Sequence, residues 1–189
     1  MYNIAVTGSL ASGKSFILNY LSNMGYKTFS CDDYVRKLYQ DIAIQNLIKN
    51  SLEDLDIFNK QNLAKIIYND AEARDKLEKI IHPKVRIAIK EFEEENKKEN
   101  FLFTEVPLLF ESGFDKYFSF SICVFCSEKT RIKRANSRGG AIDPNILEKI
   151  KQIQLGQEEK KKRADFLIDS EEEDKKIKAN LVAIINAIK

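Results

Sequence analysis

Residues 8–15 form the stretch that most limits what this chain can fold into. They read Gly8-Ser9-Leu10-Ala11-Ser12-Gly13-Lys14-Ser15 and match the pattern G-x-x-x-x-G-K-[ST]. The two glycines permit backbone angles that a side chain would prevent, so the loop N–H groups can surround phosphate oxygens. In this pattern the lysine reaches the β- and γ-phosphates, and the last hydroxyl suits Mg²⁺. We predict that these eight residues bind a nucleotide, that Lys14 also assists the reaction and that Ser15 holds the metal.

The segments on both sides of the loop have the periodicity that this motif requires. Residues 4–6 are a short apolar strand. After the loop, apolar side chains recur at helical spacing, and the stripe consists of Phe16, Ile17, Tyr20, Leu21 and Met24. Gly25 is a typical helix end. The order strand, loop, helix favours a phosphate-binding loop over the alternative, an ordinary glycine-rich turn.

The composition indicates a globular domain without charge-based affinity for polyanions. Of the 189 residues, 43% are hydrophobic and 32% are charged, and the net charge is only +2. This balance gives no electrostatic argument for nucleic acid or a membrane as a partner, and no apolar run is long enough to span a bilayer. We expect a cytoplasmic protein that is a monomer or a weak homo-oligomer.

Three cysteines are too few, and odd in number, for a disulfide framework. Cys123 and Cys126 form C-x-x-C, but they lie in an apolar stretch typical of a buried strand. A second pair that would complete a zinc site is missing from the sequence. We predict that these two residues belong to the core, with redox or metal chemistry as the alternative.

Further strands are expected at 26–30, 101–106, 119–125 and 166–169. Between the second and third strands only helical periodicity is found, which is too much helix for one crossover between parallel strands. We predict an α/β fold with the parallel sheet of a P-loop NTPase. Its core would comprise residues 1–31, 100–134 and 151–189, with a helical insert at 32–99 that suits acceptor binding.

Prolines locate the expected helix ends. Because proline disfavours helix at the residue before it but suits the first turn of a helix, His82-Pro83 predicts a junction between two helices. By the same argument, Asp143-Pro144 predicts the start of a helix that continues to about Lys162.

An aspartate pair follows the second predicted strand, where open α/β sheets bind their ligands. A carboxylate there can accept a proton from an attacking hydroxyl. The alternative is an N-cap of the next helix. We assign Asp32 as the base and Asp33 as the cap.

Three more charged residues are candidates for phosphate chemistry. Glu105 closes the third predicted strand, where an acid orders Mg²⁺; the alternative is an exposed turn residue. Arg134 and Arg138 are four residues apart on one helix face, before Gly139-Gly140. Arginines on a hinged segment can close over phosphates and stabilise transition-state charge, and the alternative is a solvated basic helix. The residues therefore favour a small-molecule kinase.

Taken together, these residues resemble the dephospho-coenzyme A kinase family over nearly the whole chain. The resemblance rests on 6–15, the turn at Asp32, Ile-His-Pro-Lys-Val-Arg at 81–86, Glu-Val-Pro-Leu-Leu-Phe-Glu at 105–111, Arg134 with Arg138, and Gln154 leading to 164–169. The His-Pro segment followed by the Val-Pro-Leu-Leu segment is much more specific than the phosphate-binding loop alone.

The resemblance implies a nucleoside-monophosphate-kinase-like enzyme that uses ATP and Mg²⁺. It would phosphorylate the ribose 3′-hydroxyl of dephospho-coenzyme A, the last step of coenzyme A biosynthesis, with Asp32 as the base and a lid at 135–150. The implied acceptor-binding residues are His82, Arg86, Pro107, Leu108, Leu109, Phe110 and Glu111. On the residues alone, His82 could instead be a structural residue at its helix junction.

The phosphate-binding loop is less rich in glycine than the family pattern, with Ser9, Leu10 and Ala11 at its variable positions, and three positions outside the loop also depart from that pattern. Ser30 replaces the first aspartate of an Asp-Ala-Asp turn, Glu105 replaces an aspartate, and Gly139 follows Arg138 where an acid is usual. Two alternatives therefore stay open. One is another P-loop kinase, acting on a nucleoside, a nucleotide or a small alcohol. The other is a non-catalytic, nucleotide-binding regulatory protein.

Overall fold

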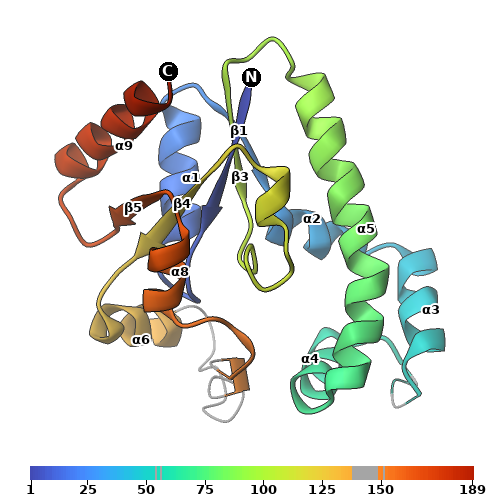
Figure 1. Cartoon of the computed structure of the whole chain (residues 1–189). Helices are drawn as coiled ribbons and strands as arrows, with labels where there is room; N and C mark the ends of the chain where they lie inside the picture. The colour runs from blue at the N-terminus through green and yellow to red at the C-terminus, as the bar shows by residue number, and fades with distance from the viewer. Residues whose placement is uncertain (54, 56, 138–148, 151) are drawn as a thin grey trace.

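Five parallel strands form the centre of the molecule (Figure 1). The computed structural model describes residues 1–53, 55, 57–137, 149–150 and 152–189. The strands are β1 (Tyr2–Thr7), β2 (Lys27–Ser30), β3 (Phe101–Glu105), β4 (Phe120–Phe125) and β5 (Phe166–Asp169). They hydrogen-bond in the order β2-β3-β1-β4-β5, and each of these pairings is parallel. The predicted α/β class with a parallel sheet is confirmed.

Helices connect the strands and cover both faces of the sheet (Figure 1). The helices are α1 (Lys14–Asn23), α2 (Cys31–Leu38), α3 (Ile42–Ser51), α4 (Lys60–Asn69), α5 (Ala71–Glu95), the 3₁₀ helix η1 (Asp115–Tyr117), α6 (Glu128–Ser137), α8 (Gln157–Arg163) and α9 (Asp174–Ile188). Helices α2 to α5 all lie between β2 and β3 in the sequence, within the range expected to be helical.

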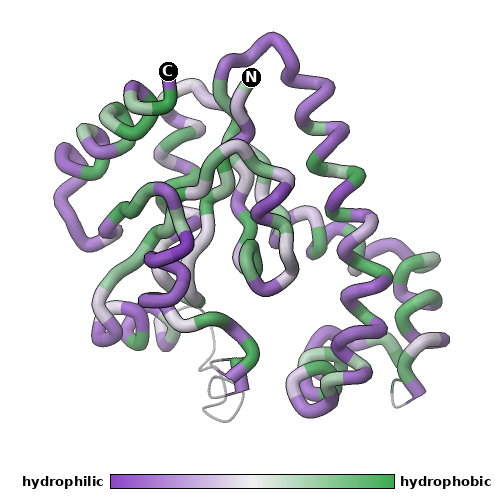
Figure 2. The backbone as a smooth tube through the Cα atoms, viewed as in Figure 1, coloured by the Kyte–Doolittle hydropathy of each residue, from purple (hydrophilic) through white to green (hydrophobic). Residues whose placement is uncertain are grey.

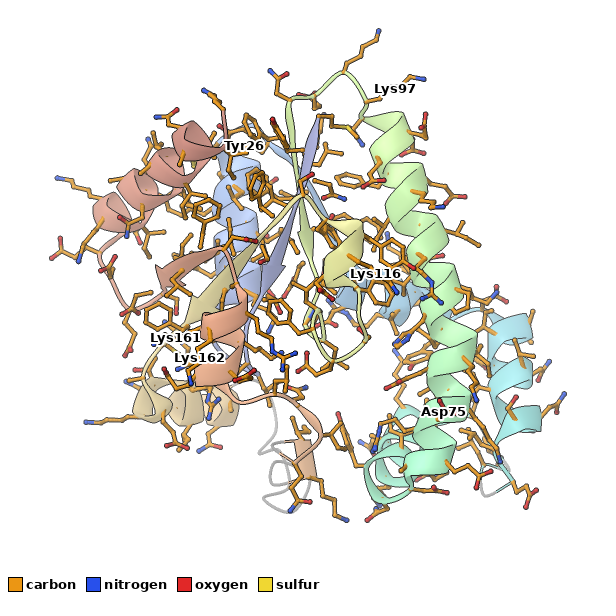
Figure 3. All side chains as sticks on the ribbon, in the orientation of Figure 1. Tyr26, Asp75, Lys97, Lys116, Lys161 and Lys162 are labelled. Carbon is orange, nitrogen blue, oxygen red and sulfur yellow. The ribbon has the colours of Figure 1, made fainter. Side chains whose placement is uncertain are left out.

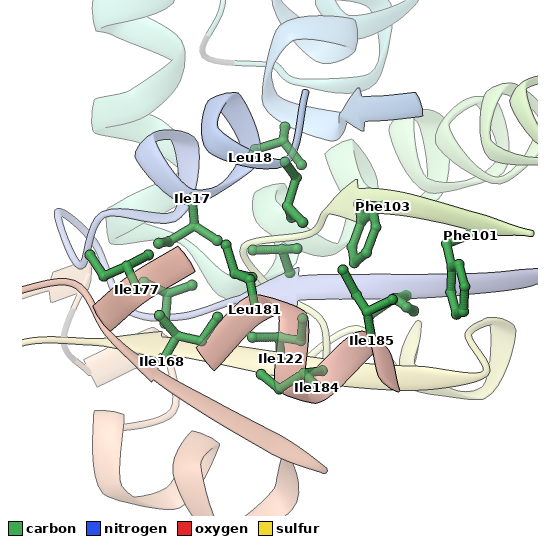
Figure 4. Close-up of a cluster of buried hydrophobic side chains, with 14 of the residues drawn as sticks. Ile17, Leu18, Phe101, Phe103, Ile122, Ile168, Ile177, Leu181, Ile184 and Ile185 are labelled. Carbon is green, nitrogen blue, oxygen red and sulfur yellow. The ribbon is translucent and has the colours of Figure 1, made fainter. Parts of the chain in front are cut away.

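Two hydrophobic clusters lie on opposite faces of the sheet because successive side chains of a strand point to opposite sides. In β1, Ile4 and Val6 join one cluster, whereas Ala5 between them joins the other. The first cluster packs α1 and α9 against the sheet, as Figure 4 shows for Ile17, Leu181 and Ile122. Burial of both faces is typical of parallel sheets.

The second cluster packs the helical insert against the other face. Helix α5 contributes more of its buried residues than any other element, from one continuous stripe, which consists of Ala73, Leu77, Ile81, Val85 and Ile89. In Figure 2 the opposite side of this helix is largely hydrophilic. Helices α3 and α4 add buried residues from their own apolar faces.

The expected helix junction at His82-Pro83 is wrong. Helix α5 runs for 25 residues through Pro83 without ending. A proline inside a helix removes one backbone hydrogen bond and costs about 3 kcal/mol. Here Ile81 and Val85 are both buried on either side of it in the same cluster, so packing of the continuous stripe outweighs the local penalty.

The expected helix to about Lys162 is also interrupted. The chain is helical at 149–150 and 152–153, leaves the helix at 154–156 and re-enters it in α8. At the break, the N–H of Leu155 donates to Glu111 Oε1 at 2.9 Å, and Gly156 has extended backbone angles. The predicted start at Asp143 lies outside the described residues.

Helix α9 is amphipathic, with apolar and hydrophilic positions alternating along its length in Figure 2. Its buried side chains belong to the cluster shared with α1. None of the helices in the described part of the chain combines the length and the apolar character needed to cross a lipid bilayer.

Two neighbouring residues of α9 test the importance of this packing. Leu181 is fully buried and Val182 is 40% exposed. We expect Leu181→Ala to lower the free energy of unfolding by about 2–5 kcal/mol, because it leaves a cavity in the core. Val182→Ala should change it by less than about 1 kcal/mol. Urea denaturation of both variants measures the difference, and equal losses would contradict the assigned packing.

Candidate active site

The phosphate-binding loop connects β1 to α1 at the carboxyl edge of the sheet. Gly8 and Gly13 have positive φ angles of 150° and 101°. A Cβ atom on Gly8 would lie 2.2 Å from the carbonyl oxygen of Val124, and one on Gly13 would lie 2.8 Å from Ser170 Cβ. Both glycines are therefore required by close contacts as well as by backbone angles.

Basic side chains hold two carbonyl groups of this loop. Lys14 Nζ donates to the carbonyl of Ser9 at 3.1 Å. The carbonyl of Ser12 accepts from Ser170 Oγ at 2.6 Å and from Arg134 Nη1 at 3.5 Å. Ser170 also accepts from the Arg134 guanidinium, at 2.7 Å on Oγ and 3.0 Å on its carbonyl. Positive charge thus lies next to the loop at two points.

Glu105 lies beside the loop and is only 3% exposed, so the alternative of an exposed turn residue is wrong. Its Oε1 accepts a hydrogen bond from Ser15 Oγ at 3.1 Å, and its Oε2 accepts one from Ser30 Oγ at 3.1 Å. The two residues predicted to hold the metal are therefore adjacent. A carboxylate and a hydroxyl are hard oxygen ligands, and this pair fits Mg²⁺.

Ser30 supplies the helix cap that was expected from an aspartate. Its Oγ accepts from the N–H of Asp33 at 3.3 Å and caps α2. The assignment of Asp33 as the cap is therefore wrong, and Asp33 instead forms an ion pair with Arg36. Ser30 suits this position because it can accept from the helix while it donates to Glu105.

Asp32 lies in the first turn of α2, directly after β2, and its side chain is exposed. Its negative charge contributes to the raised pKa of two neighbours, Cys31 and Tyr68. Burial raises the pKa of the Cys31 thiol, and the charges of Asp32 and Glu105 raise it further. Burial also raises the pKa of Tyr68 in α4, with a further contribution from Asp32. The Asp32 carboxylate thus acts on the helical insert as well as on the sheet edge.

A cavity of about 500 Å³, the loop cavity, lies next to Ser9 and Leu10. Helix α6 lines it through Arg131, Ile132 and Ala135, and the segment 154–158 lines another side. Ser9 is 4% exposed, and its Oγ has no hydrogen-bond partner among the described residues. The lining combines apolar side chains with a few polar groups, as ligand pockets do.

A smaller cavity of about 160 Å³, the insert cavity, lies between the helical insert and the core. Its lining residues include Tyr39, Tyr68, Arg74 and His82 from the insert, with Leu108, Ile150 and Gln154 opposite. Ile150 and Gln154 line both cavities. Burial lowers the pKa of His82, so its imidazole is neutral at pH 7 and can both donate and accept hydrogen bonds.

Two predicted acceptor residues meet at one aromatic ring. His82 packs edge-on against Phe114 with ring centroids 5.3 Å apart, and Arg86 Cζ lies 5.6 Å from the centroid of the same ring. Both side chains are thereby positioned by Phe114, which is buried.

The residues of segment 107–111 have different surroundings. Leu108 lines the insert cavity, whereas Leu109 is fully buried in the core and Phe110 packs against it. The carbonyl of Pro107 accepts from Thr7 Oγ1 at 3.4 Å. Glu111 forms an ion pair with Lys160 at 2.9 Å. The structure therefore brings Leu108 and His82 to one cavity, and it separates Leu109 from it.

Arg138 and most of the expected lid at 135–150 lie outside the described residues. The two cysteines of the C-x-x-C pattern are both buried with free thiols. Burial raises the pKa of Cys123 to about 11 and also raises that of Cys126, which disfavours thiolate chemistry. Within the described ranges, no group of three His, Cys, Asp or Glu residues could hold a metal ion.

Sequence reasoning missed three residues of this region. Ser170 follows β5 at the carboxyl edge, so the rule that selected Asp32 and Glu105 would also have selected it. Tyr68 lies on a helix stripe that resembles ordinary core, without a distinguishing signal. Lys160 lies in a run of charged residues typical of a solvated helix, yet it is fully buried.

The fold and the site together define a class. A phosphate-binding loop follows the central strand of a parallel sheet, a buried acid contacts the serine of the loop, and a helical insert follows β2. These features are those of the P-loop kinases of small molecules.

Comparison with known proteins identifies the family. A family model described as dephospho-CoA kinase matches residues 2–176. The dephospho-CoA kinase of Rickettsia typhi is 47% identical over 170 residues, which cover 90% of this chain and 88% of that protein. The solved dephospho-CoA kinase from Campylobacter jejuni superposes with a TM-score of 0.64 at 28% identity, covering 98% of this chain and 96% of that one. This chain belongs to the dephospho-CoA kinase family, and the predicted resemblance is confirmed.

A further solved structure supports the fold alone. The protein TT1252 from Thermus thermophilus matches with a TM-score of 0.81 at 24% identity, and the match covers 100% of this chain and 98% of that one. The arrangement of strands and helices in this chain is thus also found in an experimental structure.

Two glycines with similar backbone angles test whether the close contacts at Gly13 support nucleotide binding by the loop. Gly13 has φ 101° next to Ser170 and Arg134, whereas Gly25 has φ 93° and no atom within 4 Å of the place where a Cβ would lie. Alanine at either site adopts an unfavourable left-handed conformation that costs about 1–2 kcal/mol. Only Gly13→Ala should also displace Ser170, and we expect it to weaken ADP binding at least about tenfold, equivalent to about 1.4 kcal/mol.

Isothermal titration calorimetry with ADP measures the difference, and urea denaturation measures the strain that both variants share. Gly25→Ala is the matched control and should bind ADP like the unmodified protein. Equal ADP affinity in both variants would contradict the assigned role of Gly13.

Proposed function

We propose that this chain transfers the γ-phosphoryl group of ATP to the ribose 3′-hydroxyl of dephospho-CoA, giving CoA and ADP. Membership of the dephospho-CoA kinase family supports this reaction. The single observation in the structure that carries the proposal is the contact between Ser15 Oγ and the buried Glu105 carboxylate at 3.1 Å. It joins the loop that binds phosphate to an acid suited to the metal of the nucleotide.

In this proposal Asp32 is the general base. The 3′-oxygen forms a bond to the γ-phosphorus, the bond from that phosphorus to the β–γ bridging oxygen breaks, and the hydroxyl proton passes to the Asp32 carboxylate. An exposed carboxylate at the carboxyl edge of the sheet supports this role, because it is open to an acceptor.

The charge of the phosphates would be balanced by the loop and its neighbours. Lys14 would stabilise charge on the β- and γ-phosphates, and Arg134 and Arg138 would add positive charge from the segment after β4. Ser15 and Glu105 would hold Mg²⁺, which when bound offsets charge on the transferring phosphoryl group. Gly8 to Ser15 would supply backbone N–H donors.

We also propose that the insert at 32–99 binds the acceptor and that residues 135–150 form the lid. His82, Arg86 and the segment 107–111 would form the acceptor side of the site, with His82 and Leu108 facing dephospho-CoA from the insert cavity and the fully buried Leu109 supporting the segment from the core. That cavity is smaller than the roughly 300–1,000 Å³ of typical ligand pockets, so acceptor binding would enlarge it. The near-neutral net charge gives no electrostatic argument for a nucleic-acid or membrane partner, and the proposal includes a cytoplasmic location and a monomeric or weakly homo-oligomeric state.

A coupled ADP-release assay with ATP, Mg²⁺ and a panel of acceptors tests the reaction. The panel contains dephospho-CoA, plain nucleosides, nucleotides and shikimate. We expect turnover only with dephospho-CoA, and mass spectrometry should find one added phosphate. Turnover with another acceptor would retain the kinase mechanism but overturn the proposed substrate. ATP binding without any turnover would favour a regulatory protein.

Asp32 and Asp33 form a matched pair of substitutions in the first turn of α2. Asp32→Asn should lower kcat about 100- to 10,000-fold, because it removes the general base, and it should change the KM for ATP little. Asp33→Asn removes only the ion pair with Arg36 and should keep nearly full activity. Steady-state kinetics separates the two. An increased KM for ATP at constant kcat in Asp32→Asn would instead make Asp32 a nucleotide or metal ligand.

A further inference from the structure

Lys160 is an unusual residue for its position in the fold. It lies in the charged helix α8, yet its side chain is fully buried. Its neighbours Lys161 and Lys162, labelled in Figure 3, are partly or fully exposed. Lysine is rarely buried completely unless it is paired, so the partners of Lys160 indicate what the burial is for.

The ammonium group of Lys160 holds both ends of one short segment. Its Nζ donates to the carbonyl of Pro107 at 2.7 Å and pairs with Glu111 Oε1 at 2.9 Å. Between these two points lies Leu108, which lines the insert cavity. One buried cation therefore determines where the segment 107–111 turns, and with it the position of Leu108 in the cavity wall.

The same carboxylate extends the contact to the segment before α8. Glu111 Oε1 also accepts from the N–H of Leu155 at 2.9 Å. Leu155 lines the loop cavity, and the preceding Gln154 lines both cavities. Lys160 and Glu111 thus link the wall of the insert cavity to the wall of the loop cavity.

Stability alone does not account for this arrangement. A buried ion pair gains little net stability over an apolar pair of similar volume, because both charges must leave water. Glu111 Oε2 is moreover buried without a hydrogen-bond partner among the described residues, which carries an energetic penalty. A pair retained at this cost is better explained by the geometry that it imposes.

We propose that Lys160 is a positioning residue for the acceptor. Its buried ammonium group, acting through Glu111 and the carbonyl of Pro107, keeps Leu108 and Gln154 in the arrangement that receives dephospho-CoA. The proposal rests on the proposed kinase function and adds to it a residue that does not itself touch the substrate. In the hydrogen bonds above, Lys160 and Glu111 reach the loop cavity through the single N–H of Leu155, whereas they hold the segment 107–111 at both ends, so we expect ATP binding to be affected less than acceptor binding.

The first test is Lys160→Met, with Lys162→Met as the matched control on the same helix. We expect Lys160→Met to raise the KM for dephospho-CoA at least about tenfold, with the KM for ATP changed less than about threefold. Calorimetric titrations with dephospho-CoA and with ADP should give the same contrast in Kd. Lys162→Met should have the kinetic constants of the unmodified enzyme, because Lys162 is exposed.

The double variant Lys160→Met, Glu111→Leu separates positioning from simple structural support. It replaces both charges by apolar groups, and we expect it to regain the melting temperature lost in Lys160→Met. The KM for dephospho-CoA should nevertheless stay raised, because the segment 107–111 is no longer held at both ends. A double variant with the unmodified KM would overturn the proposal, and so would equal effects on ATP and dephospho-CoA. Failure of the unmodified enzyme to use dephospho-CoA would instead overturn the proposed function.

Discussion

The parallel pairing of all five strands is the constraint on which the rest of this molecule depends. Because parallel strands end at the same edge, the residues that follow β1, β2, β3 and β5 meet there although the chain separates them widely. The loop after β1, Glu105 at the end of β3 and Ser170 after β5 are brought into hydrogen-bonding contact in this way. Long helical connections are a consequence of the same pairing.

Sequence reasoning succeeded where one local rule determines the outcome. The glycine and lysine spacing of residues 8–15 predicted the loop, since the close contacts at Gly8 with backbone and at Gly13 with side chains allow few alternatives. The strand-end rule selected Asp32 and Glu105, and the structure places both at the carboxyl edge. Membership of the dephospho-CoA kinase family was recognisable because its motifs recur in one order along the chain.

Sequence reasoning failed where tertiary contacts override the local preference of the residues. Pro83 predicted a helix end, but the buried stripe of α5 continues through it. Asp33 is a residue type that often caps helices, but in the structure Ser30 occupies the cap position. Ser30 can accept from the first turn of α2 and donate to Glu105 at the same time. Lys160 gave no signal, since the sequence around it is that of a solvated helix. Its partners, Pro107 and Glu111, lie about fifty residues away.

The two hydrogen bonds that the Ser12 carbonyl accepts, from Ser170 and Arg134, have a consequence for how the chain folds during synthesis. Ser170 and Arg134 hold a loop that begins at residue 8, and the hydrogen bond from Ser170 to Ser12 spans 158 residues of sequence. During synthesis the loop emerges long before Ser170, so this support can form only after a further 158 residues have been added. The loop of the nascent chain therefore gains this support only after β5 has docked beside β4. Truncation before this strand would leave the loop motif intact in sequence but without its contacts to Ser170.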